Sequence, residues 1–268
     1  MHTTTSPRIA FDDVGDGPMT LLYLPGWCAN RTAFRDLLPI AARQHRAIAL
    51  DWRGHGGSEP TTHDFGTAAL VDDALAVITR SGAEVVVPVA LAHSGWVAIE
   101  LRRRLGPARV PGIVWLEWMP LGAPAPFLDV LAGLQDTHRW RDVRAQLFSM
   151  WTTGVDIPAL DHHIDEMARY DETMWARAGR EIATNFATEH SPTIAVESFD
   201  EPCPTLHLYA QPADTETLTA QEAYAAAHPW FSVERLPAAS HFPMFEIPEH
   251  LQQRVSEFAH RLQPAHAH

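Results

Sequence analysis

Apolar and polar positions along the chain fall into two alternating patterns. Short runs rich in aliphatic and β-branched residues alternate with longer segments that have the period of an amphipathic helix. The predicted strands are 20–24, 47–51, 84–90, 112–117, 205–209 and 232–236. The predicted helices between or after them are 32–43, 67–80, 95–105, 217–227 and 248–262. This alternation is typical of an α/β fold with a mostly parallel, doubly wound sheet that helices cover on both faces.

The alternation stops between residue 118 and about residue 198. There the pattern predicts four helices separated by Pro and Gly, at 127–134, 139–151, 160–169 and 172–189. We therefore predict a helical cap at 118–198 inserted into an α/β core made of 1–117 and 199–268. Some of its many large apolar side chains would line a pocket between the cap and the sheet, where ligands bind in such folds.

A sharp turn is predicted after the strand at 84–90. The segment from Ala90 to Ser94 fits the small-x-nucleophile-x-small pattern of a nucleophile elbow, which exposes a reactive side chain at the top of a sheet. Its centre is Ala92, which cannot act as a nucleophile. Centring the turn on Ser94 would put Trp96 where close strand–helix packing needs a small residue. Ala92 is therefore favoured, and Ser94 is the alternative nucleophile.

Composition narrows the possible classes of function. In 268 residues, 46% are hydrophobic and the net charge is −13, which argues against nucleic acid or an anionic membrane as a partner. All 20 basic residues are arginine, so a lysine Schiff base and a P-loop lysine are excluded. The two cysteines, Cys28 and Cys203, suggest neither a disulfide framework nor a metal site. With no signal-like start and no long apolar run, we expect a cytoplasmic protein; the oligomeric state is not predicted.

Four segments agree in order with the α/β-hydrolase fold. They are Pro25-Gly26-Trp27-Cys28 after the first long strand, the loop from Asp51 to Ser58, the turn at Ala92, and Ala239-Ser240-His241 after the last strand. In this arrangement the backbone N–H groups of Trp27 and His93 would form an oxyanion hole.

His241 is the candidate general base, because an imidazole of ordinary pKa can accept a proton near neutral pH. A partner acid must hold that imidazole, and two residues compete. Asp214 follows the penultimate strand. Glu117 lies between Leu116 and Trp118 in an apolar run, where a carboxylate is costly to bury unless it is paired. Glu117 is favoured, and Asp214 is the alternative acid.

Other polar clusters are interpreted as structural. The metal-capable residues at 161–166 fit a solvated helix face, so no metal site is predicted. Arg53 and His55 are expected to shape the turn after their strand.

Several longer peptides carry a family resemblance over nearly the whole chain. The most specific are His228-Pro229-Trp230-Phe231 and Ser240-His241-Phe242-Pro243. The other matching segments are 26–28, 51–56, His93 with 95–97, 117–118, 139–141, Trp151 and 211–212. With these the chain resembles the cofactor-independent 3-hydroxy-4(1H)-quinolone 2,4-dioxygenases.

The resemblance implies a reaction that needs no nucleophile, metal or flavin. In that family a His–Asp dyad removes the 3-hydroxyl proton of a bicyclic quinolone. The anion then reacts with O₂, and the ring opens with loss of carbon monoxide to give an N-acylanthranilate. The dyad positions match His241 and Glu117, and the resemblance places Trp27, Ala92, His93 and Trp151 around a small aromatic heterocyclic substrate.

Three positions depart from the family pattern. Familiar members carry serine where this chain has Ala92 and aspartate where it has Glu117. Some relatives have a histidine at the position of Ala29. Two other hypotheses stay open: an ester or amide hydrolase using Ser94 with His241, and a binding protein that has lost its nucleophile.

Overall fold

The apolar runs form one seven-stranded sheet. The computed structural model describes residues 7–263. The strands are β1 (Phe11–Val14), β2 (Met19–Leu24), β3 (Arg46–Leu50), β4 (Val85–Leu91), β5 (Ile113–Leu116), β6 (Thr205–Tyr209) and β7 (Phe231–Arg235). Their order is β1-β3-β2-β4-β5-β6-β7, and all neighbours are parallel except β1 with β3. The predicted mostly parallel sheet is confirmed. β2 and β5 are buried along their length, and so is β4 after its first residue, because helices cover both faces.

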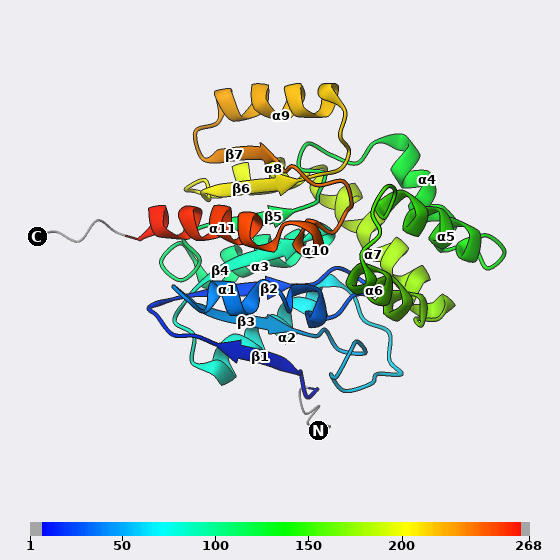
Figure 1. Cartoon of the computed structure of the whole chain (residues 1–268), viewed down its shortest axis with the longest axis horizontal. Coiled ribbons are helices and arrows are strands. Elements are labelled where there is room, and N and C mark those ends of the chain that lie inside the picture. The colour runs from blue at the N-terminus through cyan, green and yellow to red at the C-terminus, as the bar shows by residue number, and fades with distance from the viewer. Residues whose placement is uncertain (1–6, 264–268) are drawn as a thin grey trace, which may run out of the picture.

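Helices lie on both faces of this sheet (Figure 1). The helices α1 (Leu38–Ala41) and α11 (Pro248–Leu262) pack on one face. The other face carries α2 (Thr67–Ser81), α3 (Gly95–Leu105) and α8 (Pro192–Glu197). The helix α9 (Thr215–Ala227) packs beside β7 at the edge of the sheet.

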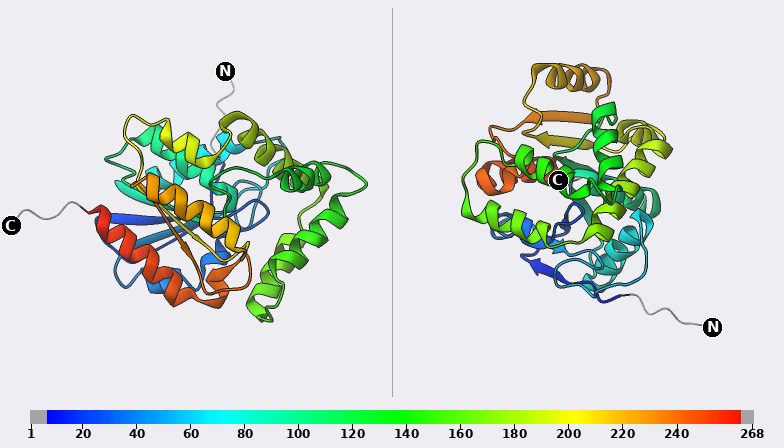
Figure 2. Two further views of the ribbon diagram at one scale, coloured as in Figure 1. Left: turned by 90° about the horizontal axis from the view of Figure 1, so that it is seen from above. Right: turned by 90° about the vertical axis from the view of Figure 1, so that its right-hand side faces the viewer.

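Five helices separate β5 from β6 in the chain. Before α8 come α4 (Ala125–Leu134), α5 (Trp140–Trp151), α6 (Pro158–Ala168) and α7 (Glu172–Glu189). We call these four the inserted helices. They lie beyond the carboxyl ends of the parallel strands (Figure 2). Polar contacts hold them there: Arg177 and Arg180 of α7 both bond Asp64, and Glu166 of α6 accepts a hydrogen bond from Asn30.

Several short elements differ from the sequence prediction. The antiparallel edge strand β1 was not predicted, since its residues are mostly exposed and show no apolar alternation. The helix predicted at 32–43 is broken into a 3-10 turn, Arg31–Phe34, and the single turn of α1, with Pro39 at the start of α1. The short helices α8 and α10 (Pro243–Glu246) were also missed. Among the described residues, no helix is long and apolar enough to cross a membrane.

Candidate active site

The turn after β4 is a strained elbow centred on Ala92. Ala92 has φ 51°, in the left-handed region that few residues other than glycine adopt. The turn then leads directly into α3, whose first residue, Gly95, lies against the ring of Trp118; a Cβ at Gly95 would be 2.2 Å from that ring. The backbone therefore has the shape of a nucleophile elbow, with a methyl group at its centre.

The hydroxyl of Ser94 is turned into the protein. Its single O–H is shared between the backbone carbonyl oxygens of Leu24 and Leu91, at 2.9 and 2.8 Å from Oγ, and the residue is buried. Ser94 does not line the main cavity. The structure therefore does not bring this alternative nucleophile to the base.

Glu117 and His241 are brought together at the carboxyl end of the sheet. Glu117 directly follows β5 and also has a positive φ, 52°. Its carboxylate accepts hydrogen bonds from the backbone N–H groups of Ala210 and Gln211, which follow β6. Glu117 Oε2 lies 3.4 Å from His241 Nδ1. A buried carboxylate is thus held by two N–H groups and faces one imidazole nitrogen.

Burial raises the pKa of the Glu117 carboxyl, while His241 and the two N–H groups act to lower it. These favourable contacts oppose the cost of taking a carboxylate out of water. A positive charge on His241 would add to them, so the pair is suited to holding a proton on the imidazole.

His241 is anchored to the end of α5. The His241 N–H donates to the Trp151 carbonyl oxygen at 2.8 Å, and the two rings stack with centroids 5.1 Å apart and planes 15° apart. The Gln211 side-chain amide donates to the carbonyl oxygens of Met150 and Ala239, at 3.2 and 2.7 Å. Sequence reasoning gave Gln211 no role; its place after the strand next to β5 was the available signal.

One of the two expected oxyanion-hole donors is already occupied. The Trp27 N–H donates to His93 Nε2 at 3.0 Å, so the expectation that it is free for a ligand is wrong for this structure. A side-chain rotamer, which the sequence does not specify, is the reason. His55 makes a similar contact with the next residue: its Nε2 accepts from the Cys28 N–H at 3.1 Å, and its Nδ1 lies 2.9 Å from the Arg53 carbonyl oxygen. His55 therefore holds the loop, as expected.

A cavity of about 1020 Å³ lies above the dyad. Glu117, His241, His93 and Trp27 line its floor near the sheet. Its walls are mostly apolar side chains of the inserted helices, including Phe127, Leu131, Leu134, Trp175, Ile182 and Phe186. An imidazole and a buried carboxylate thus lie together beneath a mostly apolar space.

Asp214 is placed differently. It is the N-cap of α9, where its carboxylate accepts from the backbone N–H of Thr217 at 2.7 Å, and the residue is exposed. It lines the outer part of the cavity but forms no ion pair with His241. Among residues 7–263, no group of three or more potential metal ligands was found.

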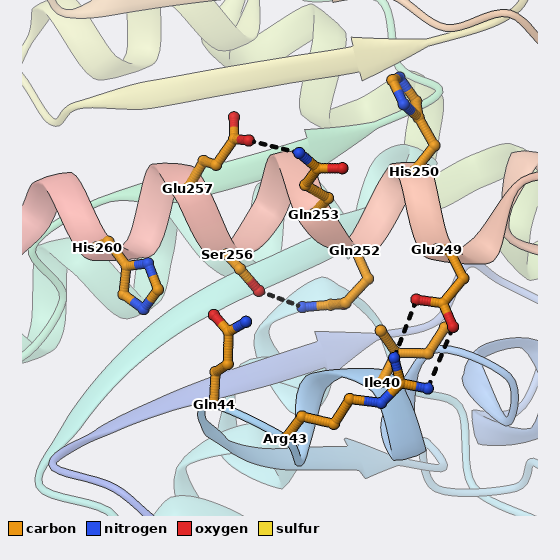
Figure 3. A pocket seen from close by; sticks show the side chains of 10 residues that line it. All are labelled: Ile40, Arg43, Gln44, Glu249, His250, Gln252, Gln253, Ser256, Glu257 and His260. Atoms are coloured by element: carbon orange, nitrogen blue, oxygen red, sulfur yellow. Dashed lines mark hydrogen bonds and ion pairs between the residues drawn. The ribbon is translucent and has the colours of Figure 1, made fainter.

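A second hollow, of about 550 Å³, lies between α1 and α11 (Figure 3). Its polar groups largely satisfy one another: Arg43 bonds Glu249, Gln252 bonds Ser256, and Gln253 bonds Glu257. The dyad and the elbow are absent from its lining. The cavity above Glu117 is therefore the better candidate site.

Comparison with known proteins agrees with this geometry. Residues 21–253 match the model of the alpha/beta hydrolase family, the class that the sheet, elbow and acid–histidine pair define. The chain is 36% identical to the 2-heptyl-3-hydroxy-4(1H)-quinolone dioxygenase of Mycobacteroides abscessus, over 92% of this chain and 93% of the relative. It is 34% identical to the 1H-3-hydroxy-4-oxoquinoline 2,4-dioxygenase of Pseudomonas putida, over 89% and 90%.

A solved structure supports the same relationship. A variant of AqdC in complex with its substrate, from work on recognition and ring cleavage of the Pseudomonas quinolone signal, superposes with a TM-score of 0.90. The two chains are 33% identical, and 97% of this chain and 99% of that one are covered. The protein belongs to the 3-hydroxy-4-quinolone dioxygenases of the alpha/beta hydrolase family.

Proposed function

We propose that this protein cleaves the heterocyclic ring of a 2-alkyl-3-hydroxy-4(1H)-quinolone with O₂, using His241 as general base and Glu117 as its partner acid. The family membership gives the reaction class. The observation that carries the residue roles is the contact between His241 Nδ1 and the buried Glu117 carboxylate, directly beneath an apolar cavity. His241 Nε2 is then the atom that takes the 3-hydroxyl proton.

The remaining steps need no further protein nucleophile. The substrate anion reacts with O₂ at C2 to give a peroxide, which closes onto C4. The ring opens as C3 leaves with its own oxygen as carbon monoxide. The two atoms of O₂ end in the new amide carbonyl and the new carboxylate of an N-acylanthranilate. The bonds and electrons balance without a metal or an organic cofactor, so we propose that O₂ is the sole cosubstrate.

The size and lining of the cavity support a substrate with an alkyl chain. The bicyclic ring would lie near His241 and Trp151, and the chain would extend among the apolar side chains of the inserted helices. We therefore propose a medium-length 2-alkyl substituent, as in the 2-heptyl compounds for which three relatives are named.

The test measures O₂ consumption and carbon monoxide release with 2-H, 2-methyl and 2-heptyl 3-hydroxy-4(1H)-quinolones, with and without chelator. His241→Ala is expected to lower kcat by about 100-fold or more, the usual contribution of a general base. Glu117→Gln should also lower kcat, since a neutral amide cannot balance the positive charge of a protonated His241. The proposal fails if the unaltered protein consumes no O₂ with any of the three compounds. Tight binding without O₂ uptake would instead indicate a binding protein.

A hydrolase is disfavoured by the position of Ser94, whose hydroxyl is bonded to two carbonyl oxygens away from the cavity. Covalent labelling of Ser94 by a fluorophosphonate would contradict this conclusion.

A further inference from the structure

The hydrogen bond between Trp27 and His93 fixes the tautomer of the His93 ring. A backbone N–H can only donate, so Nε2 must be the unprotonated, accepting nitrogen. In the neutral ring the proton is then on Nδ1. This nitrogen makes no hydrogen bond within residues 7–263 and is not shielded from solvent, and His93 lines the cavity. The site therefore contains a neutral N–H donor with no protein partner.

The surroundings of His93 keep it neutral. Burial, together with the nearby His241 and His55, lowers the pKa of His93 to about 3. When His241 takes the substrate proton, its new positive charge makes a second proton on His93 still less favourable. The neutral ring therefore carries a single proton, and the hydrogen bond to Trp27 leaves that proton on Nδ1.

No side-chain hydroxyl of the elbow is available for the same task. Ala92 has none, and the Ser94 hydroxyl donates to main-chain carbonyl oxygens. The Trp27 N–H is used by His93 itself. A ligand oxygen near the elbow thus meets the imidazole of His93 as its side-chain donor.

We propose that the Nδ1–H of His93 donates a hydrogen bond to the charged oxygen of the deprotonated quinolone, with the Trp27 N–H orienting the ring. This inference rests on the proposed function and assigns a binding group within it. Removal of the 3-hydroxyl proton leaves negative charge on the substrate oxygens, and a preorganised donor in a dry site stabilises such charge. A neutral imidazole can serve as this kind of electrophile in enzymes.

Two substitutions of His93 separate the role of its donor, Nδ1–H, from that of its acceptor, Nε2. In His93→Gln the amide oxygen can take the place of Nε2 and keep the Trp27 contact, but the Nδ1 donor is lost. In His93→Asn the amide nitrogen can take the place of Nδ1. We expect His93→Gln to lower kcat/KM by about 100-fold, the usual effect of losing one such donor. His93→Asn should lose less. His63→Gln, at an exposed loop position, is the matched control.

The decisive readout is the ionisation of bound substrate without O₂. Under anaerobic conditions, absorbance follows the pKa of the 3-hydroxyl of enzyme-bound 2-heptyl-3-hydroxy-4(1H)-quinolone. That pKa is expected to rise in His93→Gln by at least about one unit, because the anion loses its donor. An unchanged value would overturn the inference while leaving the proposed function intact. Absence of O₂ uptake by the unaltered protein would instead count against the proposed function.

A second measurement does not depend on any variant folding. In the unaltered protein labelled with ¹⁵N-histidine, NMR should find the His93 proton on Nδ1 and no titration of that ring between pH 8 and pH 5. A proton on Nε2 would overturn the inference.

Discussion

Two residues at the ends of neighbouring central strands, Ala92 and Glu117, both have left-handed backbones. Such a conformation costs about 1 kcal/mol or more for a residue with a Cβ, and it persists only where the surrounding structure requires it. Here the two turns set the floor of the cavity, one by placing His93 beneath it and the other by aiming a carboxylate at His241.

The substitution Ser94→Ala tests whether the hydroxyl of Ser94 is structural or takes part in the reaction. Ser94→Ala removes the one O–H that the carbonyl oxygens of Leu24 and Leu91 share, and it should lower the free energy of unfolding by about 1 kcal/mol. Dioxygenase activity should stay within about 2-fold, because Ser94 lies outside the cavity lining. Urea unfolding and O₂ uptake measure the two effects. Loss of activity with full stability would contradict the assignment of Ser94 as structural.

The sequence predicted the register of the elbow and favoured the acid that the structure brings to His241. Both predictions depended on local physics, namely the small residue that the elbow needs two positions after its centre, where Trp96 would not fit, and the cost of burying Glu117 alone. The contact between Trp27 and His93 was not predictable, because it depends on a rotamer set by residues 66 positions apart. The bonds of Gln211 also join residues far apart in the chain, and its place just after β6 was the one signal for them.

At the scale of elements, α3 can approach the sheet closely because its first residue, Gly95, has no side chain. Gly95 faces Trp118, which is buried between Trp96 and Trp115 with ring centroids 5.0 and 5.1 Å away. The indole cannot move aside without disturbing both neighbours. The first turn of α3, and with it the elbow, therefore depends on this contact.

Gly95→Ala should destabilise the protein although alanine is the better helix former. The new methyl would overlap the Trp118 ring, and overpacking of this kind costs about 1–3 kcal/mol. Gly57→Ala is the control, since Gly57 has no positive φ and an added Cβ there would come no nearer than 3.4 Å to its neighbours. Urea midpoints compare the two, and a Gly95→Ala protein as stable as the unaltered one would refute the packing argument.

The elements that were not predicted from the sequence are those that form only through contacts with neighbouring elements. β1 has one half-buried and three exposed residues and becomes a strand only by pairing with β3. The long buried strands and the helices α3, α7 and α11 were predicted with their bounds to within one or two residues, since each has its own apolar period.

Across the whole molecule, neutral histidines are buried in several places. Burial lowers the pKa of His55, His163 and His207 to about 4 and that of His93 to about 3. The unfolded chain therefore binds more protons than the folded one between about pH 6.5 and pH 4. The free energy of unfolding is expected to fall as the pH drops through this window, in urea titrations at fixed ionic strength.

The contribution of one histidine, His163, to this pH dependence of stability can be measured by substitution. Both of its ring nitrogens lack partners, and it packs against Phe242 and Phe245; Glu166, Arg35 and His162 are the nearby ionisable groups. His163→Leu should remove about 2 kcal/mol of the stability lost between pH 7 and pH 5. An unchanged pH dependence would show that His163 is not neutral and buried in solution.

The bonds at the end of α5 have a consequence for the alignment of His241. The Trp151 carbonyl holds the backbone of His241, and Gln211 ties Met150 to Ala239 two residues before that base. If α5 moves away to admit a ligand, these bonds break and the base loses its alignment with Glu117. The alignment of His241 with Glu117 therefore depends on where an inserted helix lies, and not on the sheet alone.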